Sequence, residues 1–224
     1  MINLKVKTVE FILKNLKDKK IEYAVLRNFE KLPNIGRDLD LITNDKINKI
    51  EDIMKLSAKK YGWTYLILDE TKNKNFLDMN KITMFYFIDL KSFDFLQVDL
   101  FKSLTVFGSP YYRIKKNNLE LFKKKYYIIS KKISYTYNLF QINSLLSDRK
   151  KNLKKIQKYR KNILKLNYKS IYRKEILFEE TLLINIYESI KKKNFKKFMY
   201  YVNVYKYIVS FNFFIKNPTK IFYL

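Results

Sequence analysis

Three aspartates, Asp38, Asp40 and Asp99, are the side chains of this sequence best placed for chemistry. Asp38 and Asp40 alternate with Leu39 and Leu41 in a short apolar stretch that predicts a strand. Because side chains of a strand alternate between its faces, both carboxylates would project to one side and both leucines into the core. Asp99 stands near the middle of a second apolar stretch, where an acid is costly unless it is paired or bound to a metal.

Carboxylates on neighbouring strands suit a particular kind of site. Two carboxylates held close together repel each other, and a divalent cation removes that repulsion. Mg²⁺ is the usual cation for oxygen ligands, and Mn²⁺ can take its place. Gln97 shares the face of Asp99 on its strand. Three carboxylates on two strands therefore predict a metal site of the kind that assists phosphoryl transfer.

Residue types that the chain lacks narrow the chemistry further. The sequence contains no Cys and no His. A disulfide framework, a thiolate metal site and a Ser–His triad are therefore excluded. Any acid–base catalysis must be performed by carboxylates, Lys or Tyr.

The aspartates stand at a recognisable spacing. Leu26-Arg27-Asn28 is followed, after nine residues, by Asp38-Leu39-Asp40-Leu41, and Asp99 is a later strand acid. This pattern resembles the nucleotidyltransferase superfamily of the DNA polymerase β type, over roughly residues 1–115. The family pattern has Gly and then Gly or Ser where Arg27 and Asn28 stand. A subgroup of bacterial relatives has a similar Leu-Arg-Gly segment.

The resemblance implies roles for particular residues. Asp38 and Asp40 would hold the Mg²⁺ or Mn²⁺ ions, and Asp99 would also bind metal and assist deprotonation of the attacking hydroxyl. The substrate would be a nucleoside triphosphate, and the acceptor an unidentified hydroxyl or phosphate. Arg27 and Asn28 would contact the triphosphate.

Arginines near the aspartates have two interpretations. The planar fork of Arg27 suits phosphate, but an ion pair with a nearby acid is the alternative. Arg37 and Arg113 are weaker candidates for substrate binding.

Periodicity predicts the elements that would position these residues. Helices are expected over 5–19 and from 47 to Gly62, with Thr43 or Asn44 capping the second helix. Strands are expected over 22–27, 38–43, 63–68, 82–90 and 95–101, with a polar loop over 69–80. The predicted fold class is α/β (α+β), a mixed β-sheet core with helices packed on it, followed by an α-helical C-terminal domain.

The character of the chain changes near residue 115. Residues 1–114 hold 20 basic and 15 acidic side chains, a net charge of +5, whereas residues 115–224 hold 27 and 6, a net charge of +21. We expect a nucleotidyltransferase-like domain over 1–114 and a basic, aromatic-rich helical domain over 115–224. Helices are predicted at 117–127, 135–147, 149–165, 172–193 and 195–215, with a turn and a strand over 216–224.

The basic half has more than one interpretation. Its lysines could form the solvated face of a helical domain, or a surface for a polyanion such as RNA or a lipid-linked phosphate. The densest run is Lys150, Lys151, Lys154, Lys155, Lys158, Arg160 and Lys161.

One long segment raises the question of a membrane. Residues 198–215 carry a single charge, Lys206, but several Tyr and Asn side chains make them polar for a bilayer centre. A buried core helix is favoured over a membrane span, and peripheral attachment, with Lys191–Lys193, Lys196 and Lys197 beside the segment, is a further alternative. Lys5 and Glu10 interrupt any signal-peptide pattern, which predicts a cytoplasmic location, with the inner membrane surface as the site of any attachment.

Two function classes follow. The first is a Mg²⁺-dependent nucleotidyltransferase, favoured by the spacing of the aspartates. The second is an inactive relative that binds a nucleotide or a polyanion, favoured by Arg27 and Asn28 in place of the glycine pair.

Overall fold

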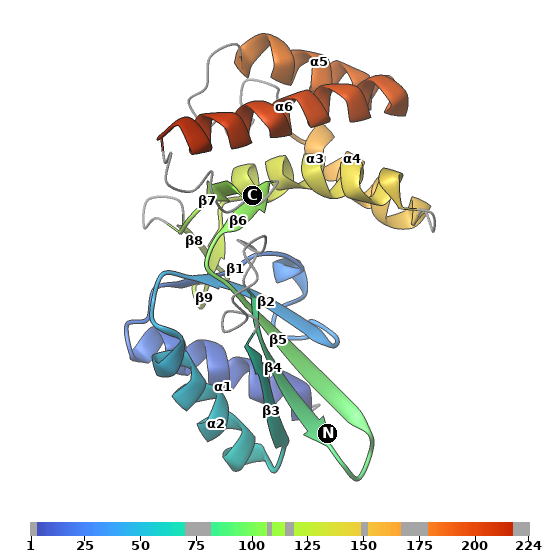
Figure 1. Cartoon of the computed structure of the whole chain (residues 1–224). Helices are drawn as coiled ribbons and strands as arrows, with labels where there is room; N and C mark the ends of the chain where they lie inside the picture. Colours follow the sequence, from blue (N-terminus) through green and yellow to red (C-terminus); the bar gives the residue numbers. More distant parts are fainter. Residues whose placement is uncertain are drawn as a thin grey trace. The chain divides into compact units, whose positions relative to one another are not determined.

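In the computed structural model, the chain contains a mixed sheet with helices packed on it and a second group of helices (Figure 1). The structure describes residues 4–69, 82–106, 109–114, 119–148, 152–166 and 179–216. The chain forms two compact units, here called the sheet unit (1–104 and 112–129) and the helical unit (105–111 and 130–224). The predicted fold class, a mixed α/β architecture, is confirmed.

Seven strands form the sheet of the sheet unit, in the order β3-β4-β5-β2-β1-β9-β8. Their bounds are β1 Tyr23–Val25, β2 Asp38–Thr43, β3 Thr64–Asp69, β4 Ile82–Asp89, β5 Asp94–Phe101, β8 Leu119–Phe122 and β9 Tyr126–Ile129. The β2–β5 and β1–β9 pairs are parallel, and the other paired strands are antiparallel. The strand with Asp38 and Asp40, β2, and the strand with Asp99, β5, are therefore neighbours in the middle of the sheet.

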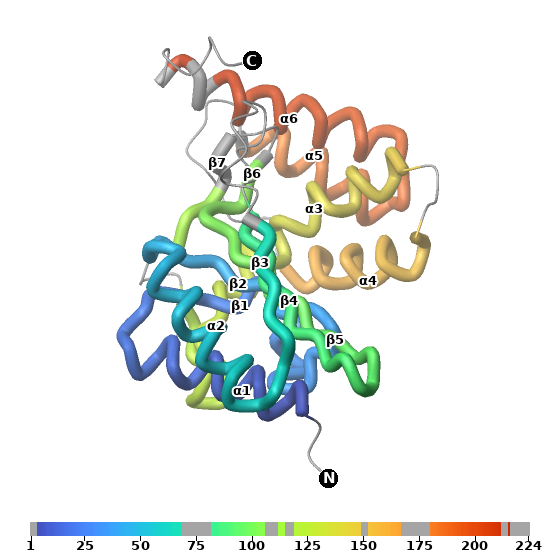
Figure 2. The backbone as a smooth tube through the Cα atoms, turned by 60° about the horizontal axis from the view of Figure 1, so that its bottom comes forward, coloured from blue at the N-terminus to red at the C-terminus, as the bar shows by residue number. Residues whose placement is uncertain are grey.

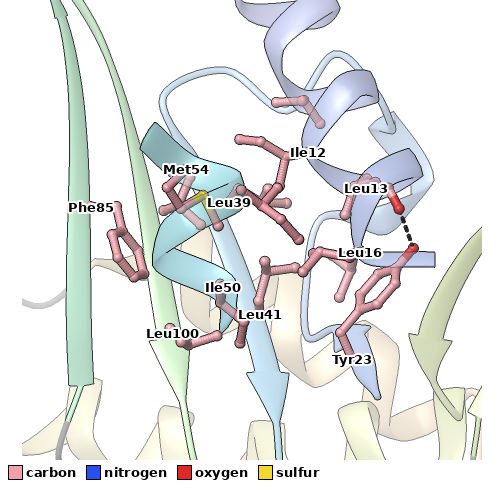
Figure 3. Packing of buried hydrophobic residues seen from close by; sticks show 14 of the residues in the cluster. Ile12, Leu13, Leu16, Tyr23, Leu39, Leu41, Ile50, Met54, Phe85 and Leu100 are labelled. Carbon is pink, nitrogen blue, oxygen red and sulfur yellow. Dashed lines mark hydrogen bonds between the residues drawn. The ribbon is translucent and has the colours of Figure 1, made fainter. Parts of the chain in front are cut away.

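Helices α1 (Leu4–Asp18) and α2 (Ile47–Tyr61) pack against one face of this sheet, as Figure 3 shows. Ile12 and Leu16 of α1 are fully buried together with Met54 of α2. Leu39 and Leu41 of β2 meet them from the sheet and are 1% and 0% exposed. The alternation predicted for β2 is thus confirmed, because its leucines face the helices and leave the aspartates on the opposite face.

The start of α2 differs from the sequence prediction. Lys46 is the N-terminal capping residue and makes no side-chain cap bond, so the expected cap by Thr43 or Asn44 is wrong. The Thr43 hydroxyl instead donates to the carbonyl of Glu22 at 2.7 Å, which ties β2 to the start of β1. The predicted end is confirmed, because Gly62 adopts φ 72°, a left-handed conformation that glycine favours.

The helix predicted over 117–127 is also wrong. Strands β8 and β9 form a hairpin there and extend the sheet, with Val25 of β1 paired to Ile128. Lys123 and Lys124 form the turn of this hairpin, with φ of 50° and 57°. Hairpin turns usually have Gly or Asn at such φ values, and the lysines here gave no indication of a turn. A single division of the chain between 114 and 115 does not describe the two units, because 112–129 belong to the sheet unit.

The described residues of the helical unit form four long helices, which confirm the helical character predicted for this half (Figure 2). Their bounds are α3 Lys131–Ser147, α4 Leu153–Leu164, α5 Glu179–Lys191 and α6 Phe195–Lys216. Neighbouring helices in space are α3 and α4, α5 and α6, α3 and α6, and α4 and α5. A separate two-stranded sheet pairs β6 (Leu104–Val106) with β7 (Ser109–Tyr112).

Some predicted features lie outside the described residues. These are most of the loop over 69–80, the first residues of the helix over 149–165 with Lys150 and Lys151, the first part of the helix over 172–193, and nearly all of the turn and strand over 216–224. Among the helices that the structure describes, none combines the length and the apolar character needed to cross a bilayer.

Candidate functional site

Asp40 and Asp99 lie directly beside each other on adjacent parallel strands. The register of β2 and β5 pairs Asp40 with Asp99, and it pairs Asp38 with Gln97. All four side chains project from the face of the sheet opposite α1 and α2. The structure therefore brings together the three aspartates that the sequence analysis singled out.

The three carboxylates differ in their exposure to solvent. Asp38, the first residue of β2, is exposed, and Asp99 is half-buried. Asp40 is 1% exposed, although it carries a carboxylate. A carboxylate removed from water in this way must be compensated by close partners.

Arg27 provides that compensation for Asp40. Its Nε donates to Oδ2 at 2.6 Å and its Nη2 donates to Oδ1 at 2.5 Å. This is the bidentate arrangement in which guanidinium and carboxylate pair most strongly. The Arg27 side chain itself is 45% exposed, so the pair stands at the boundary between the sheet and solvent. Of the two interpretations offered for Arg27, the ion pair with a nearby acid is the one present in this conformation.

Asp99 has a different environment. Burial raises the pKa of its carboxyl, and the neighbouring carboxylates of Asp40 and Asp38 raise it further. A hydrogen bond from Gln97, whose Nε2 donates to Oδ1 at 2.7 Å, and the positive charge of Arg27 act in the opposite direction. The net effect is an acid that holds its proton to higher pH than an ordinary aspartic acid.

Two neighbours on β4 complete this part of the face. Met84 lies opposite Asp99 and Tyr86 lies opposite Gln97, and both are half-buried. The Tyr86 hydroxyl is 3.4 Å from the sulfur of Met84. Asp99 is thus bordered by carboxylates on one side and by a thioether and a phenol on the other.

Asn28 supplies an unusual backbone conformation next to Arg27. Its φ of 58° and ψ of 16° lie in the left-handed region, immediately before the short 3₁₀ helix η1 (Phe29–Lys31). Asn is among the few residues other than Gly that adopt this conformation readily. The chain therefore keeps a left-handed turn at a position where the resembled family pattern has Gly or Ser.

Arg37 and Arg113, the weaker candidates for substrate binding, lie in other surroundings. The guanidinium carbon of Arg37 lies 4.9 Å from the centre of the Phe95 ring, a cation–π contact at the start of β2 and β5. The main-chain carbonyl of Arg37 accepts a hydrogen bond from Gln97 at 2.7 Å. Arg113 is exposed in the segment that follows β7.

The carboxylates of this face are suitable ligands for a divalent cation, but they are not arranged as a metal site in this conformation. The guanidinium of Arg27 is bonded to Asp40, and Asp38 and Asp99 lie on the same face of the sheet. In the part of the chain that the structure describes, no three acidic side chains are grouped so that they could hold a metal ion as they stand. For Asp40 to become a ligand, Arg27 would have to give up at least one of its two hydrogen bonds.

The sequence predicts only some of the residues on this face. Strand alternation places Gln97 on the face of Asp99, but it does not predict the hydrogen bond between them. Met84 and Tyr86 were missed, because only the β4–β5 register places them beside Gln97 and Asp99. Met84 and Tyr86 are two residues apart in a strand, which places their side chains on the same face of the sheet.

Comparisons with known proteins add little to this geometry. No protein-family model matches the chain. A search of curated proteins finds no match either. Among solved structures, the crystal structure of JHP933 from Helicobacter pylori matches over 86% of this chain and 94% of its own, with 13% sequence identity and a TM-score of 0.39. This likeness is too weak to carry an argument.

Proposed function

We propose that the chain is a Mg²⁺-dependent nucleotidyltransferase, which moves a nucleoside monophosphate from a triphosphate to a hydroxyl or phosphate acceptor. The observation that carries this proposal is the pairing of Asp40 with Asp99 on adjacent parallel strands, with Asp38 on the same face. Support also comes from the spacing of these residues in the sequence, which resembles the polymerase β-type superfamily. Mn²⁺ would substitute for Mg²⁺.

Each aspartate has a role in this proposal. Asp38, Asp40 and Asp99 would hold the divalent ions, which when bound would neutralise phosphate charge and align the in-line attack. Asp99 would also accept the proton of the attacking hydroxyl. Burial raises its pKa, and a carboxylate whose pKa lies closer to the working pH is a more effective base.

Arg27 would exchange partners during substrate binding. In the present arrangement its guanidinium neutralises Asp40. A triphosphate offers the same guanidinium several anionic oxygens in a bidentate geometry. Because the Arg27 side chain is 45% exposed, it can swing toward an incoming phosphate without passing through the core. That movement would release Asp40 as a ligand, and Asn28 would hold the adjacent turn in its left-handed conformation.

The direct experiment is a transfer assay. Labelled nucleoside triphosphates, Mg²⁺ and a cell extract that supplies acceptors should give pyrophosphate and a labelled acceptor. Asp99→Asn should lower the rate by roughly 10²–10⁴-fold or more, because it removes a base and a metal ligand while keeping the shape. The matched control is Asp52→Asn, which replaces an exposed acid on α2 and should retain full activity.

The second candidate is a binding module that holds a nucleotide or a polyanion without turning it over. One observation favours a polyanion partner: α4 contains no acid and exposes Lys154, Lys155 and Lys158. The partner would be RNA or a lipid-linked phosphate. We expect a cytoplasmic location for either of these two functions.

Salt dependence tests the polyanion partner. Replacing these three lysines of α4 by Gln should reduce the slope of log affinity for single-stranded RNA against log salt by about 2, at roughly 0.7 for each lost phosphate contact. A control that changes Lys14, Lys19 and Lys46, which are exposed on the sheet unit, removes the same charge. Equal slopes for the two triple variants would show that the lysines of α4 are an ordinary solvated face.

A further inference from the structure

Helix α6 is apolar on two opposite sides. On its inner side Phe198, Val202 and Tyr205 are 0% exposed, and the helix packs there against α5 and α3. The Tyr205 ring stacks on Phe140 of α3 with ring centres 5.9 Å apart. This inner side accounts for the attachment of α6 to the helical unit.

The outer side of α6 exposes a second row of large apolar side chains. Tyr200 is 65% exposed, Tyr207 is 67%, Phe211 is 69% and Ile215 is 59%. At 100° per residue these positions fall within about 80° of one another around the helix, and they extend over about 22 Å of its axis. We call these four residues the outer stripe. Because these side chains are large and more than half exposed, the outer stripe is a surface of the kind that binds a membrane or another protein.

Lysines surround one end of the outer stripe. Lys196 and Lys197 are exposed in the first turn of α6, and their positions fall on either side of the stripe. Lys191, Lys192 and Lys193 precede them and are exposed as well. Residues 188–216 contain seven lysines and one acid, Glu188, which lies 3.8 Å from Lys191 and 3.9 Å from Lys192. The outer stripe therefore lies in a strongly positive setting.

Charge identifies the kind of partner. A second copy of the chain would bring two sets of lysines together in a protein whose net charge is already +26. An anionic bilayer surface instead offers opposite charge to the lysines and an acyl boundary to the side chains of the stripe. The aliphatic side chain of Ile215 fits that boundary, and it offers no ring for base stacking.

We propose that the outer stripe of α6 and the lysines at its start bind the surface of an anionic lipid bilayer, with α6 lying in the plane of the interface. Tyr and Phe are suited to the headgroup level, and lysines contribute through attraction to anionic headgroups. This proposal is independent of the transferase reaction.

Vesicle flotation of the full chain tests the proposal. The wild type should float with vesicles of phosphatidylcholine mixed with phosphatidylglycerol, and binding should fall with added salt and without the anionic lipid. Phe211→Ser with Ile215→Ser should weaken binding by about tenfold or more. Lys196→Gln with Lys197→Gln should weaken it by roughly 30-fold.

Matched controls separate the surface from overall charge and apolar content. Leu90→Ser with Leu153→Ser removes apolar side chains that are 63% and 64% exposed elsewhere, and Lys14→Gln with Lys19→Gln removes the same charge from the sheet unit. Both control variants should bind as the wild type does. Circular dichroism establishes that every variant is folded.

Several outcomes would overturn the proposal. One is a wild type that does not float with anionic vesicles at low salt. A second is Phe211→Ser with Ile215→Ser binding vesicles normally while losing affinity for RNA, which would assign the stripe to nucleic acid. A third is a concentration-dependent dimer in analytical ultracentrifugation that this double variant abolishes, which would assign it to a second copy.

Discussion

Arg27 and Asp40 form a two-point ion pair, with N–O distances of 2.6 and 2.5 Å, in which the acid is 1% exposed and the base 45% exposed. The pair joins the end of β1 to the middle of β2, 13 residues apart in the sequence. It places a positive charge where the sequence analysis expected a metal ion and a phosphate. Variants of this pair can therefore test two roles of Arg27, its stabilisation of the fold and its proposed binding of substrate.

Removing Arg27 should destabilise the fold. Arg27→Ala leaves a buried carboxylate without its partner, which we expect to cost about 2–4 kcal/mol of unfolding free energy. Asp40→Asn combined with Arg27→Ala should recover much of that loss, because the buried charge is gone. Urea denaturation of both single variants and the double variant measures this coupling. Additive effects of the two changes would contradict a direct energetic pair.

The exchange proposed for Arg27 predicts effects of opposite sign on two ligands. Arg27→Gln should tighten binding of Mn²⁺ alone by roughly tenfold or more, because a competing cation has left Asp40. The same change should weaken binding of a non-hydrolysable triphosphate by about tenfold, because a bidentate contact is lost. Isothermal titration measures both affinities. Lys14→Gln removes the same charge from an exposed position of α1, and it should leave both affinities near those of the wild type.

Asp99 should make stability depend on pH in a defined direction. Its folded-state pKa is raised, chiefly by burial, so the folded protein binds this proton more tightly than the unfolded chain does. Stability is therefore lost as pH rises from the unfolded pKa, about 3.9, through the folded value. Asp99→Asn carries no charge and should be more stable than the wild type at neutral pH. That advantage should disappear below about pH 3.9. A gain of equal size at both pH values would contradict this account of the acid.

Asn28 should tolerate Gly better than Ala. At φ 58° an alanine pays the cost of the left-handed conformation, about 1–2 kcal/mol, whereas glycine does not. Both changes remove the same amide side chain, so the difference between Asn28→Gly and Asn28→Ala isolates the backbone. Thermal or urea unfolding of the two variants provides the comparison. Equal stabilities would show that the turn does not require this conformation.

Much of the fold could be predicted from alternation and helical periodicity. Leu39 and Leu41 are buried and Asp40 lies on the opposite face, as strand alternation requires. The hairpin of β8 and β9 could not be predicted, because its turn uses Lys123 and Lys124 at positive φ and carries no glycine. Local sequence favoured a helix there, and pairing with β1 overrode that preference.

The candidate site was predicted in part. The spacing of Asp38, Asp40 and Asp99 identified the three acids, because their strands obey simple alternation. The bidentate bond from Arg27 depends on how the end of β1 turns beside β2, which spacing does not determine. The neighbours Met84 and Tyr86 depend on the register between β4 and β5, which only the folded sheet establishes.

The most direct test of the central claim is titration of Mn²⁺ into the full chain in the presence of a non-hydrolysable nucleoside triphosphate. We predict saturable binding by the wild type, its loss in Asp38→Asn with Asp40→Asn, and its retention in the exposed control Asp52→Asn. Circular dichroism checks that each variant is folded. Equal binding by the wild type and the double variant, or no binding by the wild type, would contradict a metal-dependent transferase site at these aspartates.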